Sequence, residues 1–146
     1  MVAVGNPLHA SCVVIDGRAL LIAGRSGSGK SDLALRLIDR GARLLADDYT
    51  QLTAEDGRLI ATPPQAIAGK IEVRGVGILD HDHVAEAPVA LLLDLDRSPE
   101  RLPEEPLATI SLGGISIPTL GFAPFEASAA IKAEQALQRH GVGISS

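Results

Sequence analysis

A glycine-rich segment between two apolar runs constrains the fold of this chain more than any other feature. Residues 19–23 (ALLIA) are typical of a buried strand, and residues 32–38 (DLALRLI) have the apolar spacing of a helix. The residues between them read G-x-x-x-x-G-K-S and are Gly24, Arg25, Ser26, Gly27, Ser28, Gly29, Lys30 and Ser31. A strand, this loop and a helix in succession form the context of a P-loop, which binds phosphate groups.

Each part of this segment has a role in phosphate binding. Glycines lack a Cβ, so successive backbone N–H groups can surround phosphate oxygens, and the helix N-terminus adds partial positive charge. The motif predicts that Lys30 reaches the β- and γ-phosphates and that the Ser31 hydroxyl binds Mg²⁺. A dinucleotide-binding turn fits less well, because Asp32 stands where that fingerprint requires glycine or alanine.

Composition narrows the class of protein. A chain of 146 residues is long enough for one core, so we expect residues 1–146 to form a single domain, with an aliphatic core because aromatics make up only 2%. A net charge of −5 gives no overall field that attracts nucleic acid or an anionic membrane. The single cysteine, Cys12, and the lack of a signal-peptide or membrane-spanning pattern predict a cytoplasmic protein.

The rest of the chain shows several hairpins and few helices. Turn residues predict hairpins around residues 16–17, 55–57 and 113–114, and a second helix runs from Glu126 to a stop at Gly141. The other predicted elements are strands at 42–46, 71–79 and 89–93 and an exposed loop at 97–106. This pattern differs from the repeated βαβ of a standard P-loop NTPase, so we predict an α/β domain with a mixed sheet that carries a P-loop.

Carboxylates follow two of the predicted strands. Asp47 and Asp48 come directly after residues 42–46, within one structural unit of the P-loop, so we expect them beside the bound phosphates. One could hold Mg²⁺ through water, and the other could accept a proton from an attacking hydroxyl. Asp94 ends the apolar run 89–93 in the manner of a Walker-B carboxylate, but many buried strands end in Asp, which favours a structural role.

Other polar residues allow two interpretations. Glu72 and Arg74 interrupt an apolar strand and predict either a structural ion pair or a metal ligand beside a phosphate-binding cation. The residues alone leave both open. His9, taken alone, is more typical of a structural histidine, and the spacing of His81 and His83 favours a solvated turn over a metal site.

Three segments taken together resemble the HPr kinase/phosphorylase family, bifunctional P-loop enzymes that act on a serine of the phosphocarrier protein HPr. The segments are the P-loop, residues 44–48 (LLADD) and residues 71–80 (IEVRGVGILD). The last is close to the family signature I/L-E-I/V-R-G-L/V-G-I, and His9 lies where the family has a functional histidine ahead of the P-loop. The resemblance extends from about residue 8 to residue 80.

This resemblance implies a role for each matching residue. Lys30 would bind the β- and γ-phosphates, and Asp48 would accept the serine proton and return it in the reverse reaction. The other implied positions are Ser31 and Glu72 as Mg²⁺ ligands, His9 and Arg74 as supports of the phosphate site, and Arg101 as the family's later catalytic arginine. The resemblance also implies ATP and Mg²⁺, an HPr-type phosphocarrier as partner, a hexamer, and a fold similar to phosphoenolpyruvate carboxykinase.

Two departures from the family pattern shape the expected activity. The long form of the family has an N-terminal domain, so we expect a short form reduced to the catalytic domain. Residues 121–128 (GFAPFEAS) also lack the arginine of a family loop associated with dephosphorylation, and a loop without that cation holds phosphate less well. We therefore expect a protein-serine kinase rather than a phosphorylase. The alternatives are an ATP-sensing binding module without phosphotransfer and a small-molecule P-loop kinase.

Overall fold

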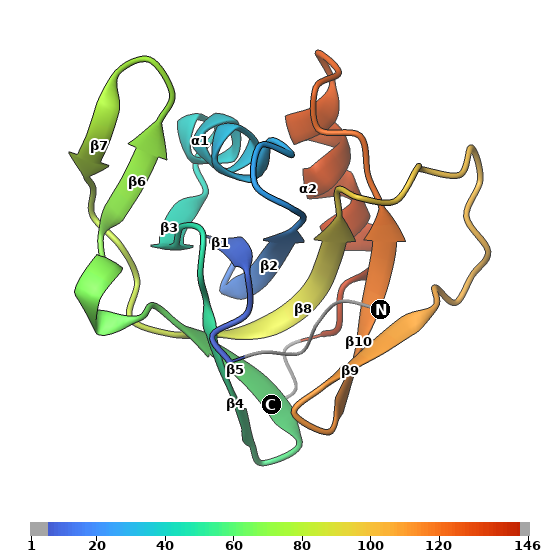
Figure 1. Cartoon of the computed structure of the whole chain (residues 1–146). Helices are drawn as coiled ribbons and strands as arrows, with labels where there is room; N and C mark the ends of the chain where they lie inside the picture. The colour runs from blue at the N-terminus through green and yellow to red at the C-terminus, as the bar shows by residue number, and fades with distance from the viewer. Residues whose placement is uncertain (1–5, 144–146) are drawn as a thin grey trace.

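The computed structural model describes residues 6–143. Within these residues the strands form a mixed eight-stranded sheet and a separate two-stranded hairpin, accompanied by two α-helices (Figure 1). The helices are α1 (Lys30–Asp39) and α2 (Ala129–His140), and a short 3₁₀ turn, η1, spans Gln65–Ile67. The strands are β1 (Ala10–Ile15), β2 (Arg18–Ala23), β3 (Arg43–Ala46), β4 (Gln51–Glu55), β5 (Arg58–Thr62), β6 (Lys70–Val73), β7 (Gly77–Asp80), β8 (Ala87–Asp94), β9 (Thr109–Leu112) and β10 (Ile115–Gly121).

The sheet is parallel at its centre and antiparallel at its margins. Its strand order is β3-β1-β2-β8-β10-β9, and β5 joins β8 to β4 outside this path. The pairs β2–β8 and β8–β10 are parallel, whereas β1–β2, β1–β3 and β9–β10 are antiparallel. This arrangement confirms the predicted mixed sheet and the predicted hairpins at residues 16–17, 55–57 and 113–114.

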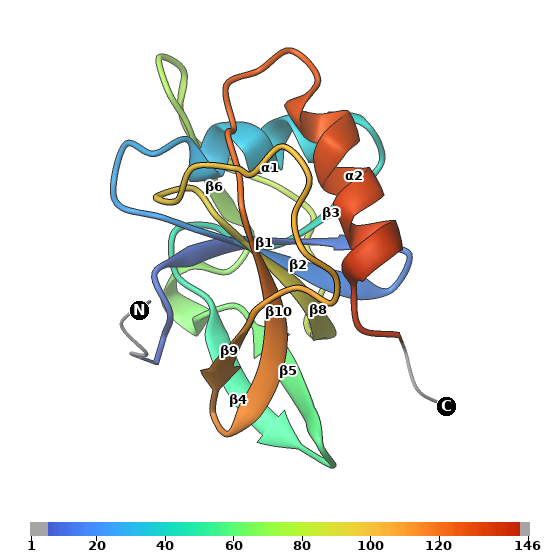
Figure 2. The ribbon, with the colours of Figure 1, turned by 90° about the vertical axis from the view of Figure 1, so that its right-hand side faces the viewer.

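Alternate residues of the central strands pack on opposite faces of the sheet. On β8, Leu91 and Leu93 pack with Leu33 and Leu37 of α1 and with the apolar face of α2. Leu92 packs on the other face, where β4, β5 and β9 lie (Figure 2). Because the side chains of a strand alternate between its two faces, one apolar run serves both halves of the core.

The limits of α1 follow from two glycines. Gly29 precedes the helix with φ 103°, and Gly41 follows it with φ 110° and donates its N–H to the Ile38 carbonyl at 3.0 Å. These left-handed conformations are easily adopted only by glycine, and Gly41 is the predicted residue after the helix C-terminus. The second helix begins at Ala129, later than the predicted Glu126, and has Gly141 as its C-cap.

The prediction of one strand over residues 71–79 is wrong. Residues 70–80 form the antiparallel hairpin β6–β7, in which Val73 pairs with Gly77 and the Val76 N–H donates to the Val73 carbonyl at 2.9 Å. Gly75 has φ 83°, so the glycines allow a chain reversal in place of one continuous strand. Arg74 therefore lies in a turn.

In the part of the chain that the structure describes, no helix combines the length and the apolar character needed to span a bilayer.

Replacing Leu91 with alanine should lower the free energy of unfolding by about 2–5 kcal/mol, because it leaves a cavity between the sheet and α1. Leu91 is 0% exposed. The control is Leu102→Ala, since Leu102 is 82% exposed in the loop after β8. Urea unfolding followed by circular dichroism measures the free energy of unfolding of both variants. Equal stability of the two variants would contradict this account of the core.

Candidate active site

The candidate site lies where several strands end at one edge of the sheet. Since β1 is antiparallel to both β2 and β3, the latter two run in the same direction, as do β8 and β10. Their carboxyl ends therefore meet at the same edge, which is where α/β sheets bind ligands. The P-loop follows β2, Asp47 and Asp48 follow β3, and residues 122–128 follow β10.

A cavity of about 700 Å³ opens at this edge and brings most of the predicted site residues together. Ser26, Gly27, Gly29, Lys30 and Ser31 line one side. The remaining lining consists of Asp32 and Leu35 of α1, Asp47 and Asp48 after β3, Glu72, Val73 and Arg74 of the β6–β7 hairpin, and Phe125.

The P-loop has the donor groups that a triphosphate requires. Lys30 Nζ donates to the carbonyl oxygens of Gly24 at 2.8 Å and Arg25 at 3.1 Å, so the ammonium curls back over its own loop. Burial lowers the pKa of Lys30, while the nearby carboxylates of Asp48, Asp96 and Asp47 oppose that shift. The ammonium thus has neutral hydrogen-bond partners and lies beside a cavity, which suits a phosphate ligand.

Close packing inside the loop explains its first glycine. A Cβ on Gly24 would lie 2.5 Å from Ser28 Oγ, and that buried hydroxyl has no hydrogen-bond partner in the structure. The Arg25 N–H donates to the carboxylate of Asp96 at 3.1 Å, which closes the base of the loop. The loop is therefore held in a defined shape.

Asp47 connects three elements around this cavity. Its Oδ1 accepts hydrogen bonds from Ser11 Oγ of β1 at 2.8 Å and from Ser31 Oγ of α1 at 2.7 Å. Its Oδ2 accepts the backbone N–H of Glu72 in β6 at 3.0 Å. Asp47 is only 6% exposed, so a buried carboxylate obtains three donors in place of water. The sequence marked Asp47 as a candidate but did not reveal its partners.

Asp48 is held in a strained turn that faces the cavity. Its φ is 67°, and the Tyr49 N–H donates to the Asp47 carbonyl at 2.7 Å across it. Ser11 Oγ also accepts the Asp48 N–H at 3.1 Å. Left-handed backbone is uncommon outside glycine, although aspartate and asparagine tolerate it best, and such residues concentrate at functional sites.

His9 supports the Asp48 side chain, which is 56% exposed. The His9 Nε2 lies 2.9 Å from Asp48 Oδ1, and the imidazole stacks on the Tyr49 ring with centroids 5.0 Å apart. His9 and Asp48, to which the resemblance gave separate roles, are therefore in direct contact. Ser11, which makes this arrangement possible, was missed; its only signal was a polar residue inside an apolar strand.

Glu72 and Arg74 contribute to the cavity from the hairpin. Within residues 6–143, the salt bridges include none between these two side chains. The structural ion pair that the sequence left open is thus not formed. Both side chains line the cavity that the P-loop lines, which leaves them available to a ligand.

Two other candidates lie outside this cavity. Arg101 is exposed in the loop after β8 and does not line it. Asp94 also does not line it, and its Oδ1 accepts the Asp96 N–H at 3.0 Å. Asp94 therefore shapes the turn after β8, which agrees with the structural role that the sequence favoured.

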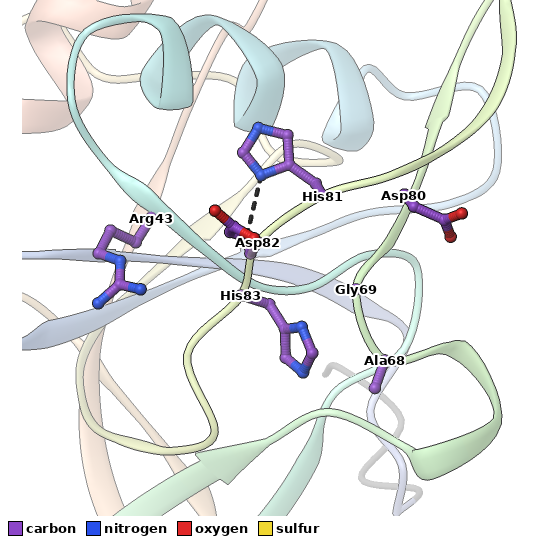
Figure 3. A pocket seen from close by; sticks show the side chains of 7 residues that line it. All are labelled: Arg43, Ala68, Gly69, Asp80, His81, Asp82 and His83. Carbon is purple, nitrogen blue, oxygen red and sulfur yellow. Dashed lines mark hydrogen bonds between the residues drawn. The ribbon is translucent and has the colours of Figure 1, made fainter.

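His81 and His83 lie on a separate surface hollow of about 490 Å³, shown in Figure 3. Their rings point in opposite directions, and His81 Nδ1 lies 2.9 Å from the Asp82 carbonyl oxygen. Among the described residues, no three His, Cys, Asp or Glu side chains are grouped so that they could hold a metal ion. His81 and His83 are exposed and lie outside the named strands, in the loop between β7 and β8.

A protein-family model and several curated proteins match part of this chain. The family model described as "HPr Serine kinase C-terminal domain" matches residues 1–85. The HPr kinase/phosphorylases of Clostridium botulinum (strain Eklund 17B) and Clostridium tetani are each 48% identical over 73 residues, which is 50% of this chain and 24% of theirs. This chain thus aligns with about a quarter of the length of those relatives.

A solved structure extends the likeness over almost the whole chain. The HPr(Ser) kinase/phosphatase from Coxiella burnetii superposes with a TM-score of 0.78 and 32% identity, covering 92% of this chain and 95% of that one. The mixed sheet and the two helices agree with this match. The chain therefore belongs to the HPr serine kinase C-terminal domain family.

Proposed function

We propose that this domain transfers the γ-phosphoryl group of ATP to a serine hydroxyl of an HPr-type phosphocarrier protein. The observation that carries the proposal is the position of Asp48. Its carboxylate lines the same cavity as Gly29, Lys30 and Ser31, with His9 against one of its oxygens. A simple nucleotide-binding module has no need of a strained acid at this position.

The proposed reaction uses these residues in distinct roles. The acceptor serine gives its proton to the Asp48 carboxylate while its oxygen bonds to the γ-phosphorus, and the bond from that phosphorus to the β–γ bridging oxygen breaks, which releases ADP. Lys30 and the P-loop N–H groups hold the β- and γ-phosphates, and Arg74 approaches from the hairpin to offset charge on the transferred group. The His9 contact fixes the direction of the Asp48 carboxylate.

Residues for Mg²⁺ are present at the same edge. Ser31 and Glu72 are the proposed ligands, with Asp47 holding the Ser31 hydroxyl at 2.7 Å. Mg²⁺ in such sites is held by few protein ligands together with phosphates and water, so a closed cage of side chains is not required. When bound, the ion neutralises charge that develops on the phosphates.

The segment after β10 favours the kinase direction in this proposal. Phosphorolysis would need an inorganic phosphate held beside phosphoserine, and residues 121–128 contain no basic side chain. The guanidinium that reaches this segment belongs to Arg36, and it donates to the backbone carbonyls of Pro124 and Glu126. The Arg36 guanidinium is therefore already hydrogen-bonded to the backbone of this segment.

Replacing Asp48 with asparagine should reduce phosphotransfer by about 100- to 10,000-fold while ATP binding persists, because the amide cannot accept the serine proton. Asparagine also tolerates the left-handed backbone, so the turn should survive. Intact-mass measurement of HPr after incubation with ATP and Mg²⁺ follows the reaction.

The matched control is Asp56→Asn, since Asp56 has φ 52° in the exposed β4–β5 turn. Unmodified HPr in the presence of an ATP-binding wild-type domain would refute the kinase proposal. Transfer at the wild-type rate by the Asp48 variant would remove the proposed proton acceptor.

Replacing Asp47 with asparagine should lower the free energy of unfolding by about 1–3 kcal/mol and weaken Mg²⁺-dependent ATP binding. An amide oxygen can still accept from Ser11 and Ser31, but the amide nitrogen then faces the Glu72 N–H, so two donors oppose each other. Urea unfolding and calorimetric titration measure the two effects, again with Asp56→Asn as control. Unchanged stability would contradict the anchoring role of Asp47.

A further inference from the structure

Phe125 is an exposed aromatic side chain at the candidate active site. It is 70% exposed, yet it lines the cavity beside the P-loop. A Cβ built on Gly29 would lie 2.8 Å from Phe125 Cζ and 3.0 Å from Cε1, so the ring meets the loop by its edge. Most of the remaining ring surface is therefore open to a ligand.

This ring stands on a well-anchored segment. Figures 1 and 2 show the connection from β10 to α2 arching beside α1. On α1, Arg36 donates to the carbonyls of Pro124 and Glu126, which flank Phe125 on either side. The Glu126 carboxylate also pairs with Lys132 Nζ at 2.7 Å. Phe125 is thus held over the first turns of α1 by the backbone on both of its sides.

Phe125 is the most exposed of the Phe and Tyr side chains of this chain. The sequence has two Phe, one Tyr and no Trp, and the core is built almost entirely from aliphatic side chains. Phe122, the other phenylalanine, is buried against the helices. Placing the remaining phenylalanine in solvent forfeits its burial, but its position on the cavity wall would allow a ligand to cover it.

We propose that Phe125 is the platform on which the base of the bound nucleotide stacks. This inference rests on the proposed ATP-dependent function and adds a base subsite to it. The polar groups Lys30, Ser31 and Asp48 lie on the phosphate side of the cavity. Phe125, whose ring edge meets Gly29, and Leu35, one helical turn beyond Ser31, instead give the cavity an apolar wall. An aromatic face binds a purine by stacking and offers nothing to a phosphate.

The alternative occupant of this wall is an apolar side chain of the acceptor protein. The geometry favours the base, because the proposed proton acceptor Asp48 follows β3 and Phe125 follows β10, with β1, β2 and β8 between those two strands. In this proposal the acceptor serine occupies the Asp48 side of the cavity, so the nucleoside takes the side where Phe125 lies. Phe125 lies on the α1 side, where Arg36 holds its segment.

The test compares ATP, GTP and inorganic tripolyphosphate as ligands in calorimetric titrations of the whole domain. Phe125→Ala should weaken ATP and GTP binding by about 5- to 150-fold, since stacking is tolerant of base identity, and should leave tripolyphosphate binding unchanged. Phe125→Trp should bind both nucleotides at least as tightly as wild type. The control is Leu102→Ala, an exposed apolar side chain outside the cavity.

The possible outcomes separate the base subsite from the proposed function. If wild type binds ATP and Phe125→Ala binds it equally well, the inference is overturned. This holds also if the Phe125→Ala variant shows a raised KM for HPr, because the ring would then contact the acceptor protein instead of the base. A parallel loss of tripolyphosphate binding would likewise overturn it, because damage to the P-loop would then explain the effect. Failure of wild type to bind any of the three ligands would overturn the proposed function itself, and the base subsite with it.

Discussion

The hydrogen bonds of the Asp47 carboxylate are the interaction on which this site depends. A buried charge is stable only if donors replace its lost water, and here the donors come from β1, α1 and β6, elements far apart in the sequence. Moving any one of them would leave part of the charge unsatisfied. The position of the P-loop helix relative to the β6–β7 hairpin is therefore fixed by a side chain that is almost inaccessible to a ligand.

The neighbouring acid, Asp48, has the opposite environment. Both carboxylate oxygens of Asp47 accept hydrogen bonds inside the protein. One carboxylate oxygen of Asp48 contacts His9, and the Asp48 side chain lines the cavity. The left-handed turn at Asp48 is what points two successive side chains in such different directions. Ser11 serves both, since it donates to Asp47 and accepts the N–H of Asp48. The backbone strain is thus maintained by the buried hydrogen bonds next to it.

The sequence predicted the features that are local and missed those that depend on tertiary contacts. The P-loop, the hairpins and the stop of α1 at Gly41 follow from backbone preferences within a few residues. Residues 71–79 were misread because Gly75 and Gly77 permit either a bulge or a reversal, and only the pairing of β6 with β7 decides between them. The partners of Asp47 and the contact of Phe125 with Gly29 join residues that are distant along the chain, and no local pattern encodes them.

Contacts within the P-loop explain how the site could respond to a polyanion. In this structure the Lys30 ammonium donates to the carbonyls of Gly24 and Arg25, and burial lowers its pKa. A phosphate oxygen would replace neutral acceptors with a charged one, which strengthens the hydrogen bond and favours the protonated lysine. Gly24 and Ser28 pack too closely for the loop to collapse further. If the loop keeps this shape, phosphate binding would require movement of the Lys30 side chain rather than rebuilding of the backbone.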